Sequence, residues 1–212
     1  MPSNAEEIIN ANIYQSFSET DGFTVERYKQ FIRHLPAMLN SVLDVGCNTG
    51  RGGQELKKWK PGIDLIGLDC VRARVDSLDP NIYSKGICSF TQNIEADTAS
   101  FDAVVAGEFI EHVPPEQIDS TLCEFFRILR LNGRLLMTTP NPRSFWEWKR
   151  KSSVLKDPSH LTQHYHECLK GRLRAIGFSR IRIYGSGKAS RNLGEHFPLF
   201  LYGSYLITAD KW

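Results

Sequence analysis

The sequence lacks the features that mark several specialised classes of protein. Its five cysteines form no C-x-x-C pair, which argues against a disulfide framework or a zinc site and for a reducing compartment such as the cytoplasm. The longest apolar run, near residues 197–207, is too short to span a bilayer, and residues 1–7 show no signal-peptide pattern. The net charge of +2 is too small to argue for nucleic acid. We therefore expect an ordinary soluble globular protein.

A glycine-rich stretch at residues 41–53 is the most informative part of the chain. It starts as an apolar run interrupted by Asp44, which predicts a buried parallel strand, and ends in small residues that predict a tight turn into a helix. Either this is an ordinary turn, or its amides face a carboxylate or phosphate ligand. The spacing Asp44-x-Gly46-x-x-x-Gly50 differs from the Gly-x-Gly-x-x-Gly dinucleotide fingerprint, and no phosphate-loop lysine follows. This spacing disfavours an NAD-dependent oxidoreductase.

The Asp-x-Gly-x-x-x-Gly spacing resembles the first motif of the class I S-adenosylmethionine-dependent methyltransferases. That resemblance implies a loop that holds the amino-acid end of S-adenosylmethionine and an acidic residue, ending the next strand, that binds the ribose. Residues 65–69 supply an apolar strand ending in a carboxylate at the separation of one βαβ unit. The implied cofactor-binding residues are Asp44, Gly46, Cys47 and Gly50 for the methionine part, Asp69 for the ribose and Asn93, with Ile94 beside it, for the adenine. Cys70, next to Asp69, is also expected to bind the cofactor. An ordinary loop role for Asn93 stays open, since the family usually has aspartate there.

The alternation of strands and helices predicts the fold. Through residues 41–139 it forecasts a parallel sheet wrapped on both faces. With the resemblance, this implies an α/β, doubly wound, mostly parallel seven-stranded sheet with an antiparallel edge strand. Residues 199–208 are expected to supply the last strand and to form the antiparallel edge pair. We expect a single domain, 1–212, with a helical cap over residues 1–40 and an acceptor-side lid with edge strands over residues 140–212.

Catalytic residues are expected after the fourth strand, residues 101–106. Glu108, Glu111 and His112 follow it, and their i, i+3, i+4 spacing would put the three side chains on one side of a helical turn. This constellation resembles a motif of the quinone-biosynthesis O-methyltransferases and of the small-RNA 2′-O-methyltransferases. The resemblance implies a divalent metal, Mg²⁺ or Mn²⁺, held by these three residues and His160. His112 as a metal-free general base and a purely structural role are the alternatives.

Two aromatic segments admit both a functional and a structural interpretation. Residues 143–151 interleave large aromatics with cations, which suits either a mobile lid over the acceptor or core packing with a solvated basic rim. In the N-terminal region, the candidates for pocket lining or plain packing are Tyr14, Phe17, Arg27 and Tyr28.

The resemblance implies an enzyme that methylates a small molecule at a hydroxyl oxygen of a quinone, phenol or glycan. A small-RNA 2′-O-methyltransferase is one alternative, although its second-histidine signature is met only loosely by His160 and His164. A non-catalytic protein that keeps the cofactor site is another. The expected partner is the small-molecule acceptor; peripheral contact with a membrane stays open, and the sequence does not fix the oligomeric state.

Overall fold

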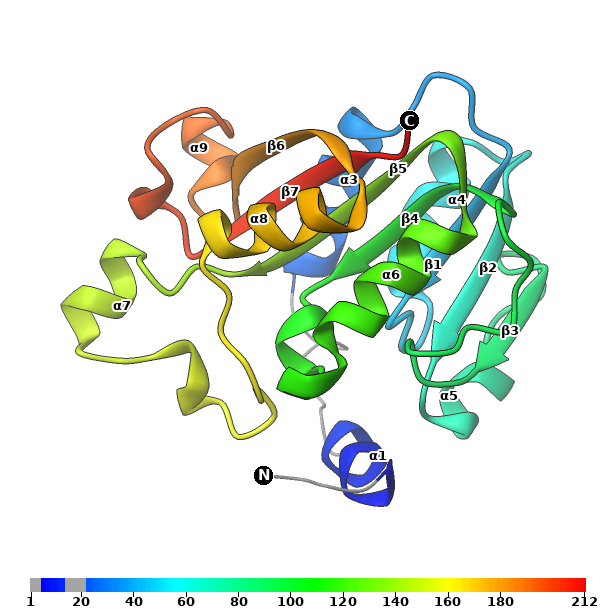
Figure 1. Ribbon diagram of the computed structural model, residues 1–212, viewed down its shortest axis with the longest axis horizontal. Coiled ribbons are helices and arrows are strands. Elements are labelled where there is room, and N and C mark those ends of the chain that lie inside the picture. The colour runs from blue at the N-terminus through cyan, green and yellow to red at the C-terminus, as the bar shows by residue number, and fades with distance from the viewer. Residues whose placement is uncertain (1–4, 14–21) are drawn as a thin grey trace.

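A seven-stranded sheet with helices on both faces forms the centre of the computed structural model (Figure 1). The structure describes residues 5–13 and 22–212, so Tyr14 and Phe17 lie outside the described residues. The strand order is β3-β2-β1-β4-β5-β7-β6. The strands are β1 (Ser41–Val45), β2 (Asp64–Asp69), β3 (Lys85–Cys88), β4 (Phe101–Gly107), β5 (Leu129–Pro140), β6 (Ser179–Ser186) and β7 (Ser204–Asp210). Strands β1 to β5 pair in parallel, and β7 runs antiparallel between β5 and β6. The predicted doubly wound fold is confirmed.

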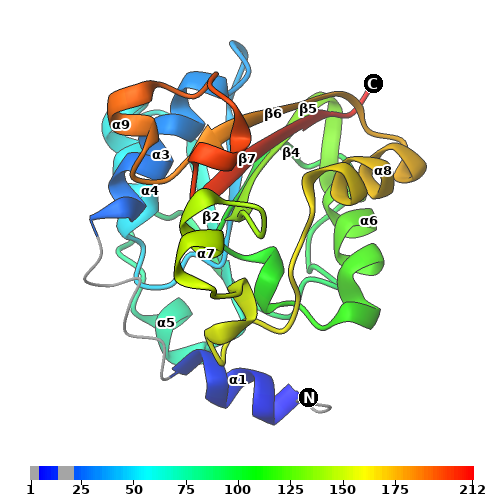
Figure 2. The same ribbon diagram turned by 90° about the vertical axis from the view of Figure 1, so that its left-hand side faces the viewer.

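The helices cover the two faces of the sheet and extend from one end of it (Figures 1 and 2). They are α1 (Ala5–Ile13), α3 (Phe23–His34), α4 (Arg51–Trp59), α5 (Arg72–Asp76), α6 (Ile118–Ile128), α7 (Phe145–Arg150), α8 (His166–Ile176) and α9 (Ser190–Leu193). Short 3-10 turns are η1 (Ile110–His112), η2 (Pro115–Gln117), η3 (Val154–Lys156) and η4 (Leu199–Leu201). Within the described residues, no helix combines the length and the apolar character needed to cross a bilayer.

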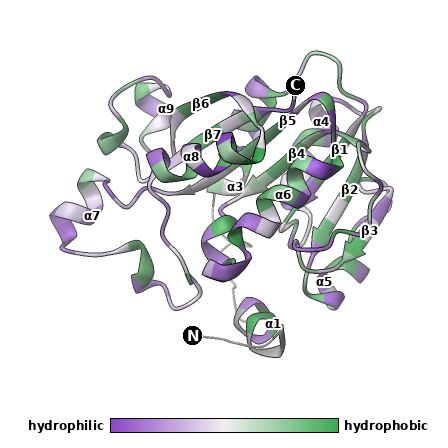
Figure 3. Cartoon of the chain, viewed as in Figure 1, coloured by the Kyte–Doolittle hydropathy of each residue, from purple (hydrophilic) through white to green (hydrophobic). Residues whose placement is uncertain are grey.

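The sheet separates two apolar clusters, and β1 contributes to both. Because side chains alternate along a strand, Leu43 and Val45 pack on the face covered by α6 and α8, whereas Val42 packs on the face covered by α3 and α4. Figure 3 shows green on the central strands and mixed green and purple on the helices, as expected for strands buried on both faces. Because β1 to β5 are parallel, their carboxyl ends lie at the same edge of the sheet, which is where ligands bind in such folds.

The last strand begins later than the sequence pattern suggests. We expected it at residues 199–208, but residues 199–201 form η4 and pairing starts at Ser204. The cause is Tyr202, which is fully buried and packs so closely on Gly185 of β6 that a Cβ there would lie 2.2 Å from the ring. The chain must turn to bury this ring before it enters the sheet.

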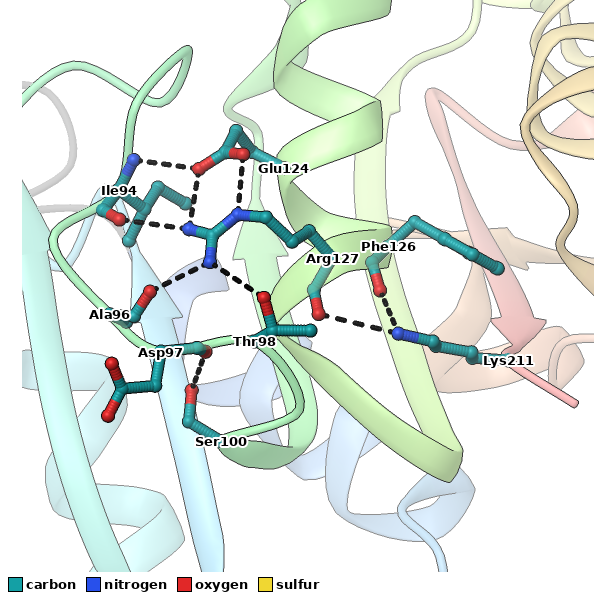
Figure 4. A network of polar contacts seen from close by, with 9 residues as sticks. All are labelled: Ile94, Ala96, Asp97, Thr98, Ser100, Glu124, Phe126, Arg127 and Lys211. Atoms are coloured by element: carbon teal, nitrogen blue, oxygen red, sulfur yellow. Dashed lines mark hydrogen bonds and ion pairs between the residues drawn. The ribbon is translucent and has the colours of Figure 1, made fainter.

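An arginine of α6 holds the irregular segment between β3 and β4 in place (Figure 4). The Arg127 guanidinium donates to both carboxylate oxygens of Glu124, at 2.7 and 2.8 Å, and to the carbonyls of Ile94 (3.0 Å) and Ala96 (2.9 Å). Glu124 in turn accepts from the Ile94 amide. Since residues 94–98 have no strand partners, these contacts satisfy their backbone groups and fix the segment that precedes β4.

Candidate functional site

A cavity of about 670 Å³ opens at the carboxyl ends of β1, β2 and β4. Its volume falls within the range of about 300–1,000 Å³ that small-molecule sites occupy. Loops that follow the first four strands line it, together with residues 157–160 of the segment after α7. The N-terminal helices add Ile8, Asn12, Thr24, Arg27 and Tyr28 to the wall. One enclosed space is thus bordered by both motifs that the sequence singled out.

The glycine loop after β1 is held by its own backbone. The amides of Gly46 and Cys47 donate to one carbonyl of β2, at 2.8 and 3.1 Å, and the Gly50 amide donates to the Cys47 carbonyl at 2.9 Å. The Asn48 amide donates to the Asp69 carboxylate at 3.1 Å. Gly46 and Cys47 do line the cavity. These four amides already have acceptors within the protein, whereas the prediction that the amides opening the next helix face an anionic group stays a prediction.

Asp44 and Gly50 lie beneath the loop and do not line the cavity. Asp44 is fully buried and accepts hydrogen bonds from the hydroxyls of Tyr28 and Tyr83, the latter at 2.6 Å. Burial, which disfavours the charged form, raises the pKa of Asp44 to about 6. Gly50 has φ +82°, and a Cβ there would lie 2.9 Å from the Tyr83 ring. The structure therefore corrects the predicted cofactor contact of both residues: they shape the loop.

Asp69, at the end of β2, lines the cavity together with Cys70. Its carboxylate accepts hydrogen bonds from the amides of Asn48 (3.1 Å) and Val71 (2.9 Å), and its Oδ2 lies 3.7 Å from a guanidinium nitrogen of Arg74. Burial raises the pKa of the Cys70 thiol to about 12, so this group is neutral. Asp69 is thus a fixed acceptor, oriented by donors from two loops, at the position predicted for the ribose.

Asn93 and Ile94 lie away from the cavity. Both border a separate shallow depression beside β3, where Asn93 is exposed and Ile94 belongs to the apolar core. The predicted adenine contact of these two residues is therefore wrong, because β3 ends at Cys88 and the next residues, 89–92, already form the cavity wall. Among them, the buried Ser89 Oγ makes no hydrogen bond to any described residue.

The acidic residues after β4 separate into two environments. Glu108, at φ +50°, lines the cavity; its Oε1 lies 3.8 Å from Nε of Arg27, and its Oε2 accepts from Ser204 at 3.3 Å. Glu111 is fully buried beside Thr139, whose hydroxyl donates to it at 3.0 Å. Burial and the nearby Glu108 charge raise the pKa of Glu111. The predicted arrangement of three side chains on one side of a turn is not observed.

Glu111, His112 and His160 form a cluster in which one potential ligand atom of each lies within 4.8 Å of the others. Glu108 is outside it, which corrects the predicted four-residue metal set. Nδ1 of His112 lies 2.9 Å from the Ser159 carbonyl, and Nδ1 of His160 lies 2.7 Å from the Val154 carbonyl. Since a carbonyl only accepts, both Nδ1 atoms carry the hydrogen, and in a neutral ring the lone pair is on Nε2. Burial lowers the pKa of His112 to about 4, so its ring is neutral at pH 7.

Comparison with known proteins finds methyltransferases among the proteins that this chain resembles. A family model described as a methyltransferase domain matches residues 42–133. The mitochondrial ubiquinone biosynthesis O-methyltransferase of Mus musculus is 30% identical over 109 residues, which cover 47% of this chain and 28% of that protein. A malonyl-[acyl-carrier protein] O-methyltransferase of Laribacter hongkongensis is 26% identical over 144 residues, covering 62% of this chain and 47% of that protein. The chain thus spans less than half the length of these curated relatives.

Solved structures agree on the fold. A SAM-dependent methyltransferase from Thermotoga maritima superposes with a TM-score of 0.73 at 19% identity, covering 99% of this chain and all of that one. Over residues 42–133 the chain is thus similar to methyltransferase domains, and its fold is that of solved S-adenosylmethionine-dependent methyltransferases.

Several polar residues of the cavity carry no signal in the sequence pattern. Ser89 and Arg74 line the cavity but belong to no motif of the sequence. Arg27, for which the sequence admits both pocket lining and plain packing, also lines it. Arg27 reaches the cavity because Gly107 has no side chain; a Cβ there would lie 2.8 Å from Cδ of the arginine. Gly107, directly after the predicted fourth strand, is the sequence feature that could have indicated this approach. Nothing in the sequence, however, links it to Arg27, eighty positions earlier.

Proposed function

We propose that the protein transfers a methyl group from S-adenosylmethionine to an oxygen of a small-molecule acceptor. The observation that carries this proposal is that a fixed carboxylate, Asp69, and the neutral imidazole of His112 line the same cavity. The carboxylate can accept hydrogen bonds from a ribose diol, and the imidazole can take the proton of an acceptor hydroxyl. Both curated relatives named above are O-methyltransferases by name, which favours an oxygen acceptor.

The cofactor would lie across the glycine loop. Asp69 would accept hydrogen bonds from the ribose hydroxyls, and Ser89, with its unsatisfied buried hydroxyl, would bind the adenine in place of Asn93. Arg27 would supply a positive charge for the methionine carboxylate, since the amides of Gly46, Cys47 and Gly50 already have acceptors within the protein. A buried polar atom without a partner costs free energy until a ligand satisfies it, so Ser89 favours the bound state.

Methyl transfer is an in-line displacement that needs alignment and removal of one proton. The acceptor oxygen forms a bond to the methyl carbon as the carbon–sulfur bond breaks, and the sulfur keeps that electron pair. Nε2 of His112 would take the hydroxyl proton, since the Ser159 carbonyl fixes the other nitrogen as the donor. The lowered pKa of about 4 keeps the His112 ring unprotonated at neutral pH.

As the alternative to proton removal by His112, we propose Mg²⁺ or Mn²⁺ at this site, because the single lone pair on Nε2 of His112 either takes the proton or binds a cation. The buried Glu111 Oε1 makes no hydrogen bond to any described residue, and the Nδ1 atoms of His112 and His160 are paired with carbonyls, which is how metal-bound histidines are oriented. This donor set fits such a cation. When bound, the cation would lower the pKa of an acceptor hydroxyl. Glu111, His112 and His160 would hold it.

The test measures transfer of labelled methyl from S-adenosylmethionine to catechols, hydroxyquinones and sugars, with and without a chelator. Loss of the base predicts that His112→Ala lowers turnover by about 10²–10⁴-fold. His166→Ala, at a partly exposed histidine beginning α8, is the matched control and should retain turnover.

His160→Ala separates the metal from the metal-free mechanism. If the mechanism uses a metal, His160→Ala and the chelator should each abolish turnover. Added Mn²⁺ should then restore the turnover of the chelator-treated unchanged protein but not that of His160→Ala. If the mechanism is metal-free, His160→Ala and the chelator should each leave most of the turnover. Cofactor binding without methyl release to any acceptor would instead support the non-catalytic alternative.

A further inference from the structure

The segment after β5 exposes an unusual concentration of aromatic side chains. We call residues 143–156, which contain α7 and η3, the basic aromatic arm. Trp148 is 75% exposed and Trp146 45%, and Phe145 and Leu155 are also exposed. The Phe145 ring centroid lies 5.5 Å from that of Trp146 and 5.7 Å from that of Trp148, so these rings form one surface cluster. The core-packing interpretation of these aromatics is therefore wrong.

Two more exposed phenylalanines adjoin the arm. Phe197 and Phe200 are 53% and 52% exposed, and Phe200 belongs to η4, which packs beside α7. Figures 1 and 2 show α7 standing out from the sheet at the end where α9 and η4 also lie. Large exposed apolar groups from neighbouring elements mark an interaction surface, because isolated ones are ordinary but grouped ones are not.

The basic aromatic arm carries a large excess of positive charge. Its cations are Arg143, Lys149, Arg150, Lys151 and Lys156, and its only carboxylate is Glu147. This gives the arm a net charge of +4, whereas the whole chain carries +2. The remaining residues are therefore net acidic, and the positive charge is concentrated where the aromatics are.

The individual side chains keep this charge on the surface. Oε2 of Glu147 is buried, so its carboxylate points inward. Lys149, Arg150 and Lys151 are exposed, and Nζ of Lys149 lies about 6.0 Å from the ring centroid of Phe145 and 5.9 Å from that of Trp146. Arg143 is engaged with Glu167 and Tyr165. Lys149 thus borders the aromatic cluster directly, and the exposed Arg150 and Lys151 follow it in the chain.

We propose that the basic aromatic arm binds the surface of a membrane rich in anionic lipids. Tryptophan and phenylalanine rings are amphipathic or apolar groups that enter the headgroup region, and adjacent lysines and arginines are attracted to anionic headgroups. The arm runs directly into residues 157–160, which form part of the cavity wall. Docking would therefore bring the acceptor side of the cavity next to the bilayer.

Vesicle co-sedimentation of the full chain tests this proposal without requiring turnover, so it is independent of the proposed function. Vesicles of phosphatidylcholine are compared with vesicles containing one-third phosphatidylglycerol. We expect binding to the second kind only, weakening with added salt. Replacing Lys149, Arg150 and Lys151 by glutamine should weaken binding about a hundredfold, since each cation near such a surface contributes roughly tenfold or less.

A matched control comes from α4, which covers one face of the sheet. Trp59 and Lys58, at the end of α4, are also an exposed tryptophan beside an exposed lysine. The Trp59→Ser and Lys58→Gln double variant should bind as the unchanged protein does. Trp146→Ser with Trp148→Ser should lose most binding. Equal losses in both variants would overturn the proposal.

Quenching by lipids with brominated acyl chains locates the contact. A Trp59→Phe and Trp212→Phe variant keeps only the tryptophans of the arm, and its fluorescence should fall on binding. A variant with Trp146→Phe and Trp148→Phe should show no such decrease. The proposal fails if anionic vesicles do not bind at low salt. It also fails if the arm variants instead abolish self-association or RNA binding while vesicles are ignored.

Discussion

At the scale of single residues, the cofactor loop depends on two glycines that make room for distant tyrosines. A Cβ on Gly52 would lie 2.1 Å from Cζ of Tyr28, and one on Gly53 would lie 2.1 Å from the hydroxyl of Tyr83. Only because these positions are glycine can both hydroxyls reach Asp44. The sequence shows the glycines but not their partners, which belong to other elements of the fold.

Gly52→Ala should destabilise the fold. Since the tyrosine ring is fully packed, the new methyl group forces it away from Asp44, and overpacking of this kind costs about 1–3 kcal/mol. Gly171→Ala, on the exposed face of α8 with nothing within 4 Å of the new Cβ, is the matched helical control. It should stabilise by up to about 1 kcal/mol. Urea denaturation checks both, and equal effects would contradict the packing argument.

The buried Asp44 predicts a specific pH dependence of stability. Its pKa rises from 3.8 to about 6 on folding, so the folded state binds the proton more tightly than the unfolded state. The resulting stability is fully present below pH 4 and is lost as the pH rises through 6. Relative to Asp44→Asn, the protein should lose up to about 3 kcal/mol across this window. Urea unfolding at pH 4, 5, 6 and 7 measures it; parallel pH profiles would contradict the assignment.

At the scale of elements, the sequence predicts best where the signal is local. Residues 41–45, 64–69 and 101–107 form strands at the expected positions, because each is a short apolar run bounded by turn residues. The segment between β3 and β4 has no periodicity, and the adenine contact predicted there falls on Asn93, which lies outside the cavity. Its path is set by Arg127, a contact over thirty positions along the chain.

Arg127→Lys should therefore cost stability despite the retained charge. Lysine cannot reproduce the paired contacts to Glu124 together with those to two carbonyls, so we expect a loss of about 1–3 kcal/mol. Arg172→Lys, in an exposed ion pair with Asp119, should change stability by less than about 0.5 kcal/mol. Hydrogen exchange should also accelerate at the Ile94 amide, which donates to Glu124, in the first variant alone.

At the scale of the whole molecule, the cavity wall contains both residues that the sequence predicts and residues that it does not. The glycine loop and Asp69 are local motifs of neighbouring strands, so their meeting follows from parallel topology. Arg27 and His160 come from segments on either side of the core, and only the folded chain brings both into the same wall. Ligand binding should consequently stabilise the entire fold rather than one loop.

S-adenosylhomocysteine at a hundredfold excess over its Kd should stabilise the fold by about 2.7 kcal/mol, because it binds only the native state. For a chain of this size that raises Tm by about 5–10 °C. Asp69→Ala should remove most of the shift, measured against that variant's own Tm, since the ribose loses its acceptor. Asn93→Ala, outside the cavity, should keep the full shift, and Ser89→Ala should lose part of it. A shift with NAD⁺ of the same size, or an unchanged shift in Asp69→Ala, would contradict the assignment of this cavity to the methyl donor.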